Sequence, residues 1–265
     1  MATEARRGGA ELQGELWGAG AARWAEQEDR QRPIYEEVLT RAGAGEGSRL
    51  LDVGCGSGAA LQIAVGRGAR VAGLDASVAL IELARVRVPG ADLRVGDLQR
   101  LPFEDASFDV VTGFNSFQFA DDVIAALREA ARVVTPGGHV AVQVWGRADR
   151  CQSLAVIRAI GPFLPGPVPG PPGGGNYSDP GVLEALVTEA GLRPEATGDV
   201  VCTFEYTDRE EVVRTTLAAG MAELAVRSAG EAAVRAAVEA AVEPYETADA
   251  SYRFENEWHY LIAAA

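Results

Sequence analysis

The stretch that most limits the fold is LLDVGCGSG at residues 50–58, where a short apolar run ends in three glycines at alternate positions. Glycine adopts backbone conformations closed to other residues, and its missing β-carbon leaves room for a ligand beside the main chain. A strand, a turn of this kind and a helix together direct helix amide groups to the carboxyl edge of a sheet, where open α/β folds bind ligands. We therefore expect an α/β fold with a ligand site at this turn.

Short β-branched runs alternate with helical patterns between about residues 48 and 145. This alternation is typical of a parallel sheet built from βαβ units with right-handed connections. We expect a helix in each of the four gaps between five strands. The expected strands are Arg49–Val53, Arg70–Leu74, Asp92–Val95, Asp109–Gly113 and Val140–Trp145.

A helical segment precedes this block at residues 11–41, and Pro33 is expected to divide it into two helices. We treat residues 1–45 as N-terminal cap helices and residues 46–265 as the main domain. Within the main domain, residues 162–181 contain seven prolines and six glycines. Such a composition excludes a helix or a central strand and predicts a stiff loop, which could serve as a lid.

The C-terminal part predicts more helices and two more strands. Asp179 and Pro180 have the residue types of a helix start, and Gly191 would end that helix. Residues 208–243 are rich in alanine and glutamate, and a capping box of Ser228 and Glu231 would split them into two helices. These helices form an insertion at 208–248 between two further strands, which lie at 199–206 and 251–264 and would pair with each other.

The composition of the chain limits the kinds of partner that it can bind. The 265-residue chain has a formal net charge of −14, which offers no overall positive field for a nucleic-acid backbone. Cys55, Cys151 and Cys202 are odd in number and widely spaced, so they suggest neither a disulfide framework nor a zinc site. The sequence shows no signal-peptide core and no apolar run near the roughly 18 residues of a membrane span. We expect a cytoplasmic monomer or homodimer that binds a small molecule, with no nucleic acid, membrane or metal.

Three aspartates follow or end successive strands of the block. Asp52 precedes the glycines, Asp75 ends the second strand 21 residues after Gly54, and Asp97 follows the third strand. An acid at the end of the second strand can accept hydrogen bonds from both hydroxyls of an adenosine ribose. The glycines have the spacing G-x-G-x-G, which departs from the G-x-G-x-x-G of dinucleotide-binding proteins. This departure argues against a nicotinamide oxidoreductase.

Four segments stand in a specific order and spacing: LLDVGCGSG, VAGLDAS, VGDLQRLPFEDASFDVV and RVVTPGGHVAV. In these segments the chain resembles the class I S-adenosylmethionine-dependent methyltransferases, in particular the small-molecule group similar to the ubiquinone-biosynthesis methyltransferases. The resemblance covers about residues 48–145 and is weak outside them. It implies a three-layer αβα, Rossmann-like sheet of seven strands in the order 3-2-1-4-5-7-6, with strand 7 antiparallel and helical cap elements.

The resemblance also implies which residues hold S-adenosylmethionine. The backbone at Gly54 and Gly56 would hold the methionine part, and Asp75 would take the ribose hydroxyls. Asp97 would accept a hydrogen bond from the adenine amino group, and Leu98 would pack on the ring. The full set of expected cofactor residues is Asp52, Gly54, Cys55, Gly56, Gly58, Asp75, Ala76, Asp97, Leu98, Phe114 and Asn115.

The segment FNSFQF at residues 114–119 corresponds to the part of the family that lines the sulfonium and its methyl group. Asn115 and Gln118 would face the reaction, and Gln118 would orient the acceptor by hydrogen bonds. Enzymes that methylate the exocyclic amines of bases or glutamine side chains carry an Asn/Asp-Pro-Pro-Tyr run at this place. The sequence NSFQ disfavours that substrate class.

Few residues qualify as a general base. His139 begins the fifth strand away from the carboxyl edge and is expected at the surface. His259 lies in the last strand, where packing is favoured and a weak base is the alternative, and Tyr177 is either a lid residue or an exposed loop aromatic. Core packing explains the N-terminal aromatic residues as readily as a ligand site does. The catalytic candidates are Gln118, Tyr177 and His259, and the substrate-binding candidates are Trp17, Trp24, Tyr35, Gln118 and Tyr177.

These features predict an enzyme that moves a methyl group to O, N or C of a small, hydrophobic or aromatic metabolite, in a pathway of natural-product biosynthesis. The helices at 208–243 would roof the substrate pocket, with a dimer face or a solvated helix pair as alternatives. The absence of a clear base supports another class of function. In that alternative, the S-adenosylmethionine-binding fold serves non-methylating catalysis, such as a cyclisation, or acts as a binding protein.

Overall fold

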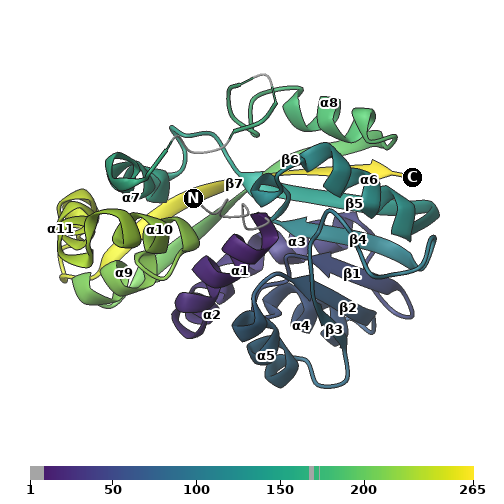
Figure 1. Cartoon of the computed structure of the whole chain (residues 1–265), viewed down its shortest axis with the longest axis horizontal. Helices are drawn as coiled ribbons and strands as arrows, with labels where there is room; N and C mark the ends of the chain where they lie inside the picture. The colour runs from purple at the N-terminus through teal and green to yellow at the C-terminus, as the bar shows by residue number, and fades with distance from the viewer. Residues whose placement is uncertain (1–8, 167–169, 173) are drawn as a thin grey trace, which may run out of the picture.

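Seven strands form one mixed sheet in the order β3-β2-β1-β4-β5-β7-β6 (Figure 1). The computed structural model describes residues 9–166, 170–172 and 174–265. Neighbouring strands run parallel except at β7, which is antiparallel to both β5 and β6, so the predicted order and the antiparallel seventh strand are confirmed. The strands are β1 (Arg49–Val53), β2 (Arg70–Asp75), β3 (Asp92–Val95), β4 (Phe108–Phe114), β5 (Val134–Trp145), β6 (Arg193–Tyr206) and β7 (Tyr252–Ala264).

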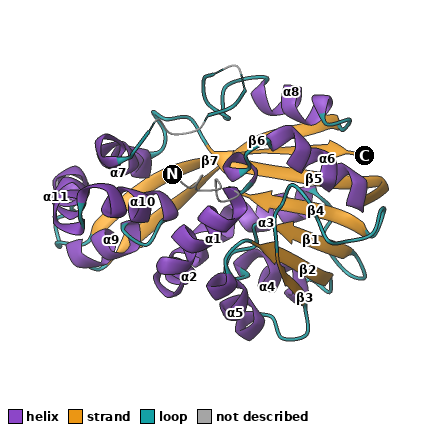
Figure 2. Cartoon of the chain, in the orientation of Figure 1, coloured by secondary structure: helices purple, strands orange, loops and turns teal. Residues whose placement is uncertain are grey.

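Helices cover both faces of the sheet, because alternate side chains of its strands enter two different cores (Figure 2). Leu50 packs in the core that contains Leu61 of α4, whereas Leu51 packs in the core that contains Leu127 of α6. The predicted αβα layering is therefore confirmed. The helices are α1 (Gly9–Ala19), α2 (Ala21–Glu28), α3 (Arg32–Arg41), α4 (Ala59–Gly66), α5 (Val78–Arg87), α6 (Val123–Val133), α7 (Gln152–Ile160), α8 (Val182–Glu189), α9 (Arg209–Thr216), α10 (Gly220–Ala229) and α11 (Glu231–Val242), with short 3-10 turns η1 (Asp29–Gln31), η2 (Phe117–Phe119), η3 (Gly161–Phe163) and η4 (Glu243–Tyr245).

The expectation of a helix in all four gaps of the central block is wrong for the gap between β3 and β4. Residues 96–107 form turns and bends instead. Leu101 is buried in the core beside α6, and the guanidinium of Arg132 donates to the backbone carbonyls of Leu101 and Phe103 at 2.9 Å each. A side chain from α6 thus satisfies carbonyls that a helix would otherwise have paired.

The N-terminal segment contains three helices rather than the two predicted. The chain breaks at Gly20 and again in the 3-10 turn η1, and Pro33 lies in the first turn of α3. Proline is tolerated at that position because its missing N–H would have no partner within the helix. Residues 1–8 of the predicted cap lie outside the described residues.

Two predicted helix starts in the C-terminal part are wrong. Gly181 precedes α8 with a φ of 82°, so the helix begins after it and not at Asp179. Residues 208–243 form three helices rather than two, and the residue before α11 is Gly230, with a φ of 87° and no side-chain cap. The Ser228–Glu231 capping box does not form, because Ser228 lies within α10. In both cases a glycine with positive φ sets the boundary instead of a side-chain cap.

The helices α7, α9, α10 and α11 gather around an extension of β6 and β7 at one end of the sheet (Figure 1). In the described strands, residues 252–257 of β7 pair with β6 but not with β5. The N-terminal helices connect this extension to the central strands, because α1 contacts α5 and α10 and α2 contacts α5 and α9. Ion pairs Arg30–Glu211 (2.6 Å) and Arg214–Glu26 (2.8 Å) join η1 and α2 to α9.

Candidate active site

The turn after β1 needs glycine at two positions. Gly54 and Gly56 have φ angles of 73° and 54°. A β-carbon at Gly54 would lie 2.4 Å from the β-carbon of Ser116, and one at Gly56 would lie 2.1 Å from Oε1 of Glu28. The glycines therefore allow the end of β4 and the helix α2 to close on the turn. The space that a side chain would fill at these two positions is already occupied by protein atoms.

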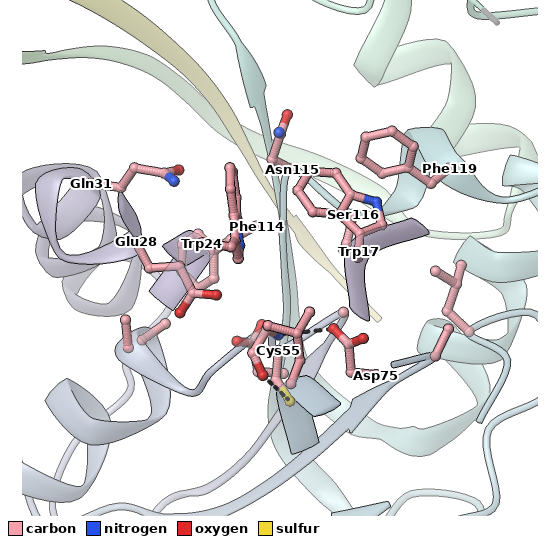
Figure 3. A pocket seen from close by; sticks show the side chains of 18 of the residues that line it. Trp17, Trp24, Glu28, Gln31, Cys55, Asp75, Phe114, Asn115, Ser116 and Phe119 are labelled. Carbon is pink, nitrogen blue, oxygen red and sulfur yellow. Dashed lines mark hydrogen bonds between the residues drawn. The ribbon is translucent and has the colours of Figure 1, made fainter. Parts of the chain in front are cut away.

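A cavity, here called the cofactor cavity, lies between the carboxyl ends of β1, β2 and β4 and the N-terminal helices (Figure 3). Asp75 lines it at the end of β2, and its carboxylate accepts hydrogen bonds from the backbone N–H groups of Gly56 (2.9 Å) and Ser77 (2.8 Å). Its lining includes the expected residues Asp52, Gly54, Cys55, Gly56, Asp75, Ala76, Leu98, Phe114 and Asn115.

Asp97 lines a smaller cavity that continues the cofactor cavity and shares Asp75 and Leu98 with it. Asp75 and Asp97 thus stand at the ends of the adjacent strands β2 and β3, with the apolar Leu98 facing both spaces. Gly58 lines neither space in the described structure. It precedes α4 with a φ of 86°, and a β-carbon there would lie 3.3 Å from the side chain of Ala84, so its role is in packing.

Three buried carboxylates border the cofactor cavity. Glu28, Asp52 and Asp75 are 4%, 1% and 9% exposed. Burial raises the pKa of Glu28 to about 7 and that of Asp52 to about 8, although hydrogen bonds from Ser57 and Thr112 oppose these shifts. Burial also raises the pKa of Asp75, and backbone N–H groups oppose it. Burial thus favours the neutral form of these acids, and a cation bound beside them would favour their ionised form.

Cys55 lines the same cavity without the environment of a nucleophile. Burial raises the pKa of its thiol well above the usual range, and the neighbouring carboxylates raise it further. A thiol in such surroundings stays protonated and is a poor nucleophile. Cys55 is therefore a small, buried residue that fills the turn.

A second cavity, here called the apolar cavity, lies among the N-terminal helices, α7, α9, α10 and the extension of β6 and β7. Counting their open mouths, the cofactor and apolar cavities hold about 760 and 830 Å³, a size that suits small-molecule ligands. No charged side chain lines the apolar cavity among the residues that the structure describes. Its walls include Trp145, Val156, Ile160, Phe204, Tyr206, Val212, Met221 and Phe254.

The two cavities meet at a junction formed by five residues that line both: Trp17, Trp24, Gln31, Asn115 and Phe119. The ring of Trp17 packs edge-on against Trp24 and Phe119, with centroid distances of 4.6 and 5.5 Å. Gln31 is 3% exposed, and its carboxamide has no hydrogen-bond partner within the described chain. Figure 3 shows that this carboxamide extends into the cavity from η1. The carboxamide is therefore available to hydrogen-bond a ligand at the junction.

Asn115 at the junction has a φ of 52°, in the left-handed region that asparagine tolerates better than most residues other than glycine. Nε2 of Gln118 donates to Oδ1 of Asn115 at 2.5 Å. Gln118 itself lines neither of the two large cavities. Together with Tyr177 it lines a small space between the sheet and the helices α6 and α8. The structure therefore places Gln118 behind Asn115 and places Tyr177 away from the junction.

The histidines and Tyr35 do not lie at the junction either. His259 lies on β7 outside both cavities, and its Nδ1 is 2.7 Å from Oδ1 of Asp199 on β6. The structure does not bring His259 to the junction, so we propose no base role for it. His139 lies on β5 outside both linings, and its Nε2 is 3.1 Å from Oε2 of Glu195 on β6. Tyr35 lines the cofactor cavity but not the apolar one, and its ring packs edge-on against Phe114.

Sequence reasoning missed the N-terminal contribution to the site beyond the aromatic residues. Gln13, Glu28 and Gln31 all line the cofactor cavity. Glu28 and Gln31 belong to the polar run EQEDRQ at residues 26–31, in which nothing distinguishes an inward residue from a solvated one. The hydrophobic period of a helix marks buried apolar residues and gives no signal for buried polar residues.

The residues present fit an adenosyl amino acid. Carboxylates end two adjacent strands where a ribose and an adenine would be recognised, an apolar residue lies between them, and buried acids border the end beside the glycine turn.

A family model described as a methyltransferase domain matches residues 51–142. A 27-O-demethylrifamycin SV methyltransferase of Amycolatopsis mediterranei is 32% identical over 212 residues, which cover 72% of this chain and 73% of that protein.

The chain belongs to the class I S-adenosylmethionine-dependent methyltransferases. The family prediction is thereby confirmed. A malonyl-[acyl-carrier protein] O-methyltransferase of Serratia marcescens is 32% identical over 141 residues, 51% of this chain and 55% of that protein, so the match spans little more than half of this relative. A chain from the complex between the Haloferax volcanii Trm112 methyltransferase activator and a methyltransferase has a TM-score of 0.63 at 23% identity, covering 94% of this chain and 97% of that chain.

No group of three or more histidine, cysteine, aspartate or glutamate side chains is arranged to hold a metal ion within residues 9–166, 170–172 and 174–265. No helix in the same ranges combines the length and the apolar character needed to cross a bilayer.

Proposed function

We propose that this methyltransferase moves a methyl group from S-adenosylmethionine in the cofactor cavity to a small, largely apolar acceptor in the apolar cavity. The observation that carries the proposal is the junction, where five residues line both cavities. A methyl group can pass directly between two ligands only if their sites meet. The membership of the family supports the reaction, and the apolar walls support the class of acceptor.

The chain's own residues would hold the cofactor by the groups described above. Asp75 would accept from the ribose hydroxyls, Asp97 from the adenine amino group, and Leu98 would pack on the ring. When bound, the sulfonium supplies an already activated methyl group. The protein therefore has to align the acceptor atom and exclude water, and the aromatic side chains of Trp17 and Trp24 at the junction suit both tasks.

The lining of the apolar cavity supports a neutral acceptor. A charged acceptor would lose its hydration without gaining a partner of opposite charge among the described lining residues. The titratable side chain in this lining is Tyr206, and burial raises its pKa, so it is a poor base at neutral pH. We infer that the acceptor presents its own nucleophile and that Gln31 supplies a hydrogen bond to a polar group beside it. Natural-product biosynthesis is a plausible setting for such an acceptor.

Calorimetry tests the cofactor half of this proposal. Asp75→Asn keeps the shape of the side chain but replaces one acceptor oxygen with a donor, so we expect at least a tenfold loss of affinity for S-adenosylmethionine. Asp92→Asn, an exposed change on β3, is the matched control and should bind like the wild type. Unchanged affinity in the Asp75 variant would remove the ribose assignment.

Transfer of label tests the acceptor half. The protein is incubated with methyl-labelled cofactor and a panel of acceptors that pairs each neutral aromatic or polyketide-like compound with a charged analogue. We expect label in the neutral members. Label in only the charged members would contradict the acceptor class, and conversion of a compound without label would favour the non-methylating alternative. A cytoplasmic location, a monomeric or homodimeric state and the absence of nucleic-acid binding stay predictions.

A further inference from the structure

Glu28 is a buried acid that family membership does not account for. It is the last residue of α2, and its side chain reaches across Gly56 to the glycine turn (Figure 3). Oε1 accepts a hydrogen bond from the backbone N–H of Ser57 at 2.8 Å, and Oε2 accepts one from the Ser57 hydroxyl at 2.6 Å. The carboxylate is thus held at the wall of the cofactor cavity by a cap helix that lies outside the matched family core.

The charges around Glu28 do not balance. Arg87 of α5 has its guanidinium 3.9 Å from Oε2 of Glu28, but the same guanidinium is 3.2 Å from Asp29. Asp52 of β1 and Asp75 of β2 also line the cavity, and electrostatic repulsion from Asp75 acts on Glu28. Tyr35 of α3 and Cys55 of the turn are neutral neighbours, since burial raises the pKa of both. This end of the cavity therefore carries an excess of negative charge whenever Glu28 is ionised.

The cofactor and its product differ in charge, and the excess of negative charge favours the more positive of the two. S-adenosylmethionine carries an ammonium, a sulfonium and a carboxylate, with a net charge of +1. Loss of the methyl group leaves a neutral thioether, and the net charge of S-adenosylhomocysteine is zero. A buried negative charge interacts more favourably with the first ligand than with the second.

We propose that Glu28 makes the cofactor cavity selective for the charged S-adenosylmethionine over its neutral thioether product. In this inference, which rests on the proposed function, the carboxyl group of Glu28 gives its proton to solvent when the cation binds, and the carboxylate remains. Methyl transfer then removes the charge that the carboxylate had stabilised, which weakens the hold on the product. Glu28 is a specificity-determining residue that acts through charge.

Titration calorimetry of the full chain at pH 7, in two buffers with different ionisation heats, measures both affinity and proton release. Because the pKa of Glu28 is about 7 and that of Asp52 about 8, the wild type should release protons when S-adenosylmethionine binds and fewer when S-adenosylhomocysteine binds. Glu28→Gln should reduce this difference in proton release and lower the preference for S-adenosylmethionine about fivefold. Glu26→Gln removes a negative charge from the exposed face of the same helix and should behave like the wild type.

Each outcome decides a separate point. If the wild type binds neither ligand, the proposed function fails. If Glu28→Gln binds both ligands with the wild-type preference and proton release, Glu28 only docks the helix and the inference fails. If circular dichroism shows that Glu28→Gln is unfolded, the wild type alone decides. Its preference for S-adenosylmethionine should then rise between pH 6 and pH 8 as Glu28 ionises, and a flat preference would overturn the inference.

Discussion

Replacing Gly54 by alanine isolates the close approach between the turn and the end of β4. Alanine at a φ of 73° costs about 1 kcal/mol for the left-handed backbone alone. Its β-carbon would also meet that of Ser116 at 2.4 Å. Ser116 cannot easily yield, because its hydroxyl donates to the carbonyl of Val53 at 2.6 Å. Overpacking of this kind costs a further ~1–3 kcal/mol, so we expect a total loss of about 2–4 kcal/mol in the free energy of unfolding.

Gly43→Ala is the matched control for this substitution. Gly43 has a φ of 76°, but a β-carbon there meets nothing within 4 Å in the described structure. It should lose only the backbone share, about 1 kcal/mol. Urea unfolding at one pH measures the stability of both variants. Calorimetry should show that Gly54→Ala also binds S-adenosylmethionine more weakly, since Ser116 lines the cofactor cavity next to Asn115 of the junction. Equal losses of stability in the two variants would refute the steric argument.

Three further predictions concern polar residues of the site. The pKa of Glu28 is raised to about 7 and that of Asp52 to about 8. The folded protein therefore holds more protons than the unfolded chain between about pH 4.5 and 8, so the free energy of unfolding should fall as pH rises through this window. In urea unfolding between pH 5 and 8, Glu28→Gln should make this fall with pH less steep. Gln31→Leu should raise the KM for an acceptor about tenfold with little change in cofactor affinity. Equal losses of affinity for the acceptor and for the cofactor would contradict a role at the junction. Gln118→Leu should lower kcat severalfold, because it removes the hydrogen bond to Asn115. Gln118→Glu should do the same, because an ionised carboxylate cannot donate that bond. A wild-type kcat in both variants would contradict a positioning role for Gln118.

The sequence predicts the sheet well because its strands are determined by local patterns. Short apolar runs mark β1, β2 and β4, and Asp52 and Asp75 near the ends of the first two point to one edge of the sheet. Asp75 and Leu98 lie at the cofactor cavity for this reason. The helix boundaries are less accurate, because Gly181 and Gly230 adopt positive φ values that no preceding cap residue announces.

The side chains at the junction are harder to predict, because contacts between distant segments choose them. A position in FNSFQF does not tell whether Asn115 or Gln118 faces the ligand. A left-handed backbone at Asn115 turns its side chain toward both cavities and leaves Gln118 behind it. The sequence leaves Tyr177 as either a lid residue or an exposed loop aromatic, and the structure packs it between the sheet and α8.

The sequence by itself determined the sheet, the glycine turn and the acids at the ends of β1 and β2 and just after β3, since each depends on residues close together in the chain. The tertiary structure decided where the polar run before α3 lies. Its residues Glu28 and Gln31 enter the site because α2 and η1 dock between the glycine turn and α9, with contacts that join residues such as Arg30 and Glu211 across 181 positions. Local propensity carries no information about such a contact, because the energy that selects it comes from a partner that is distant in sequence.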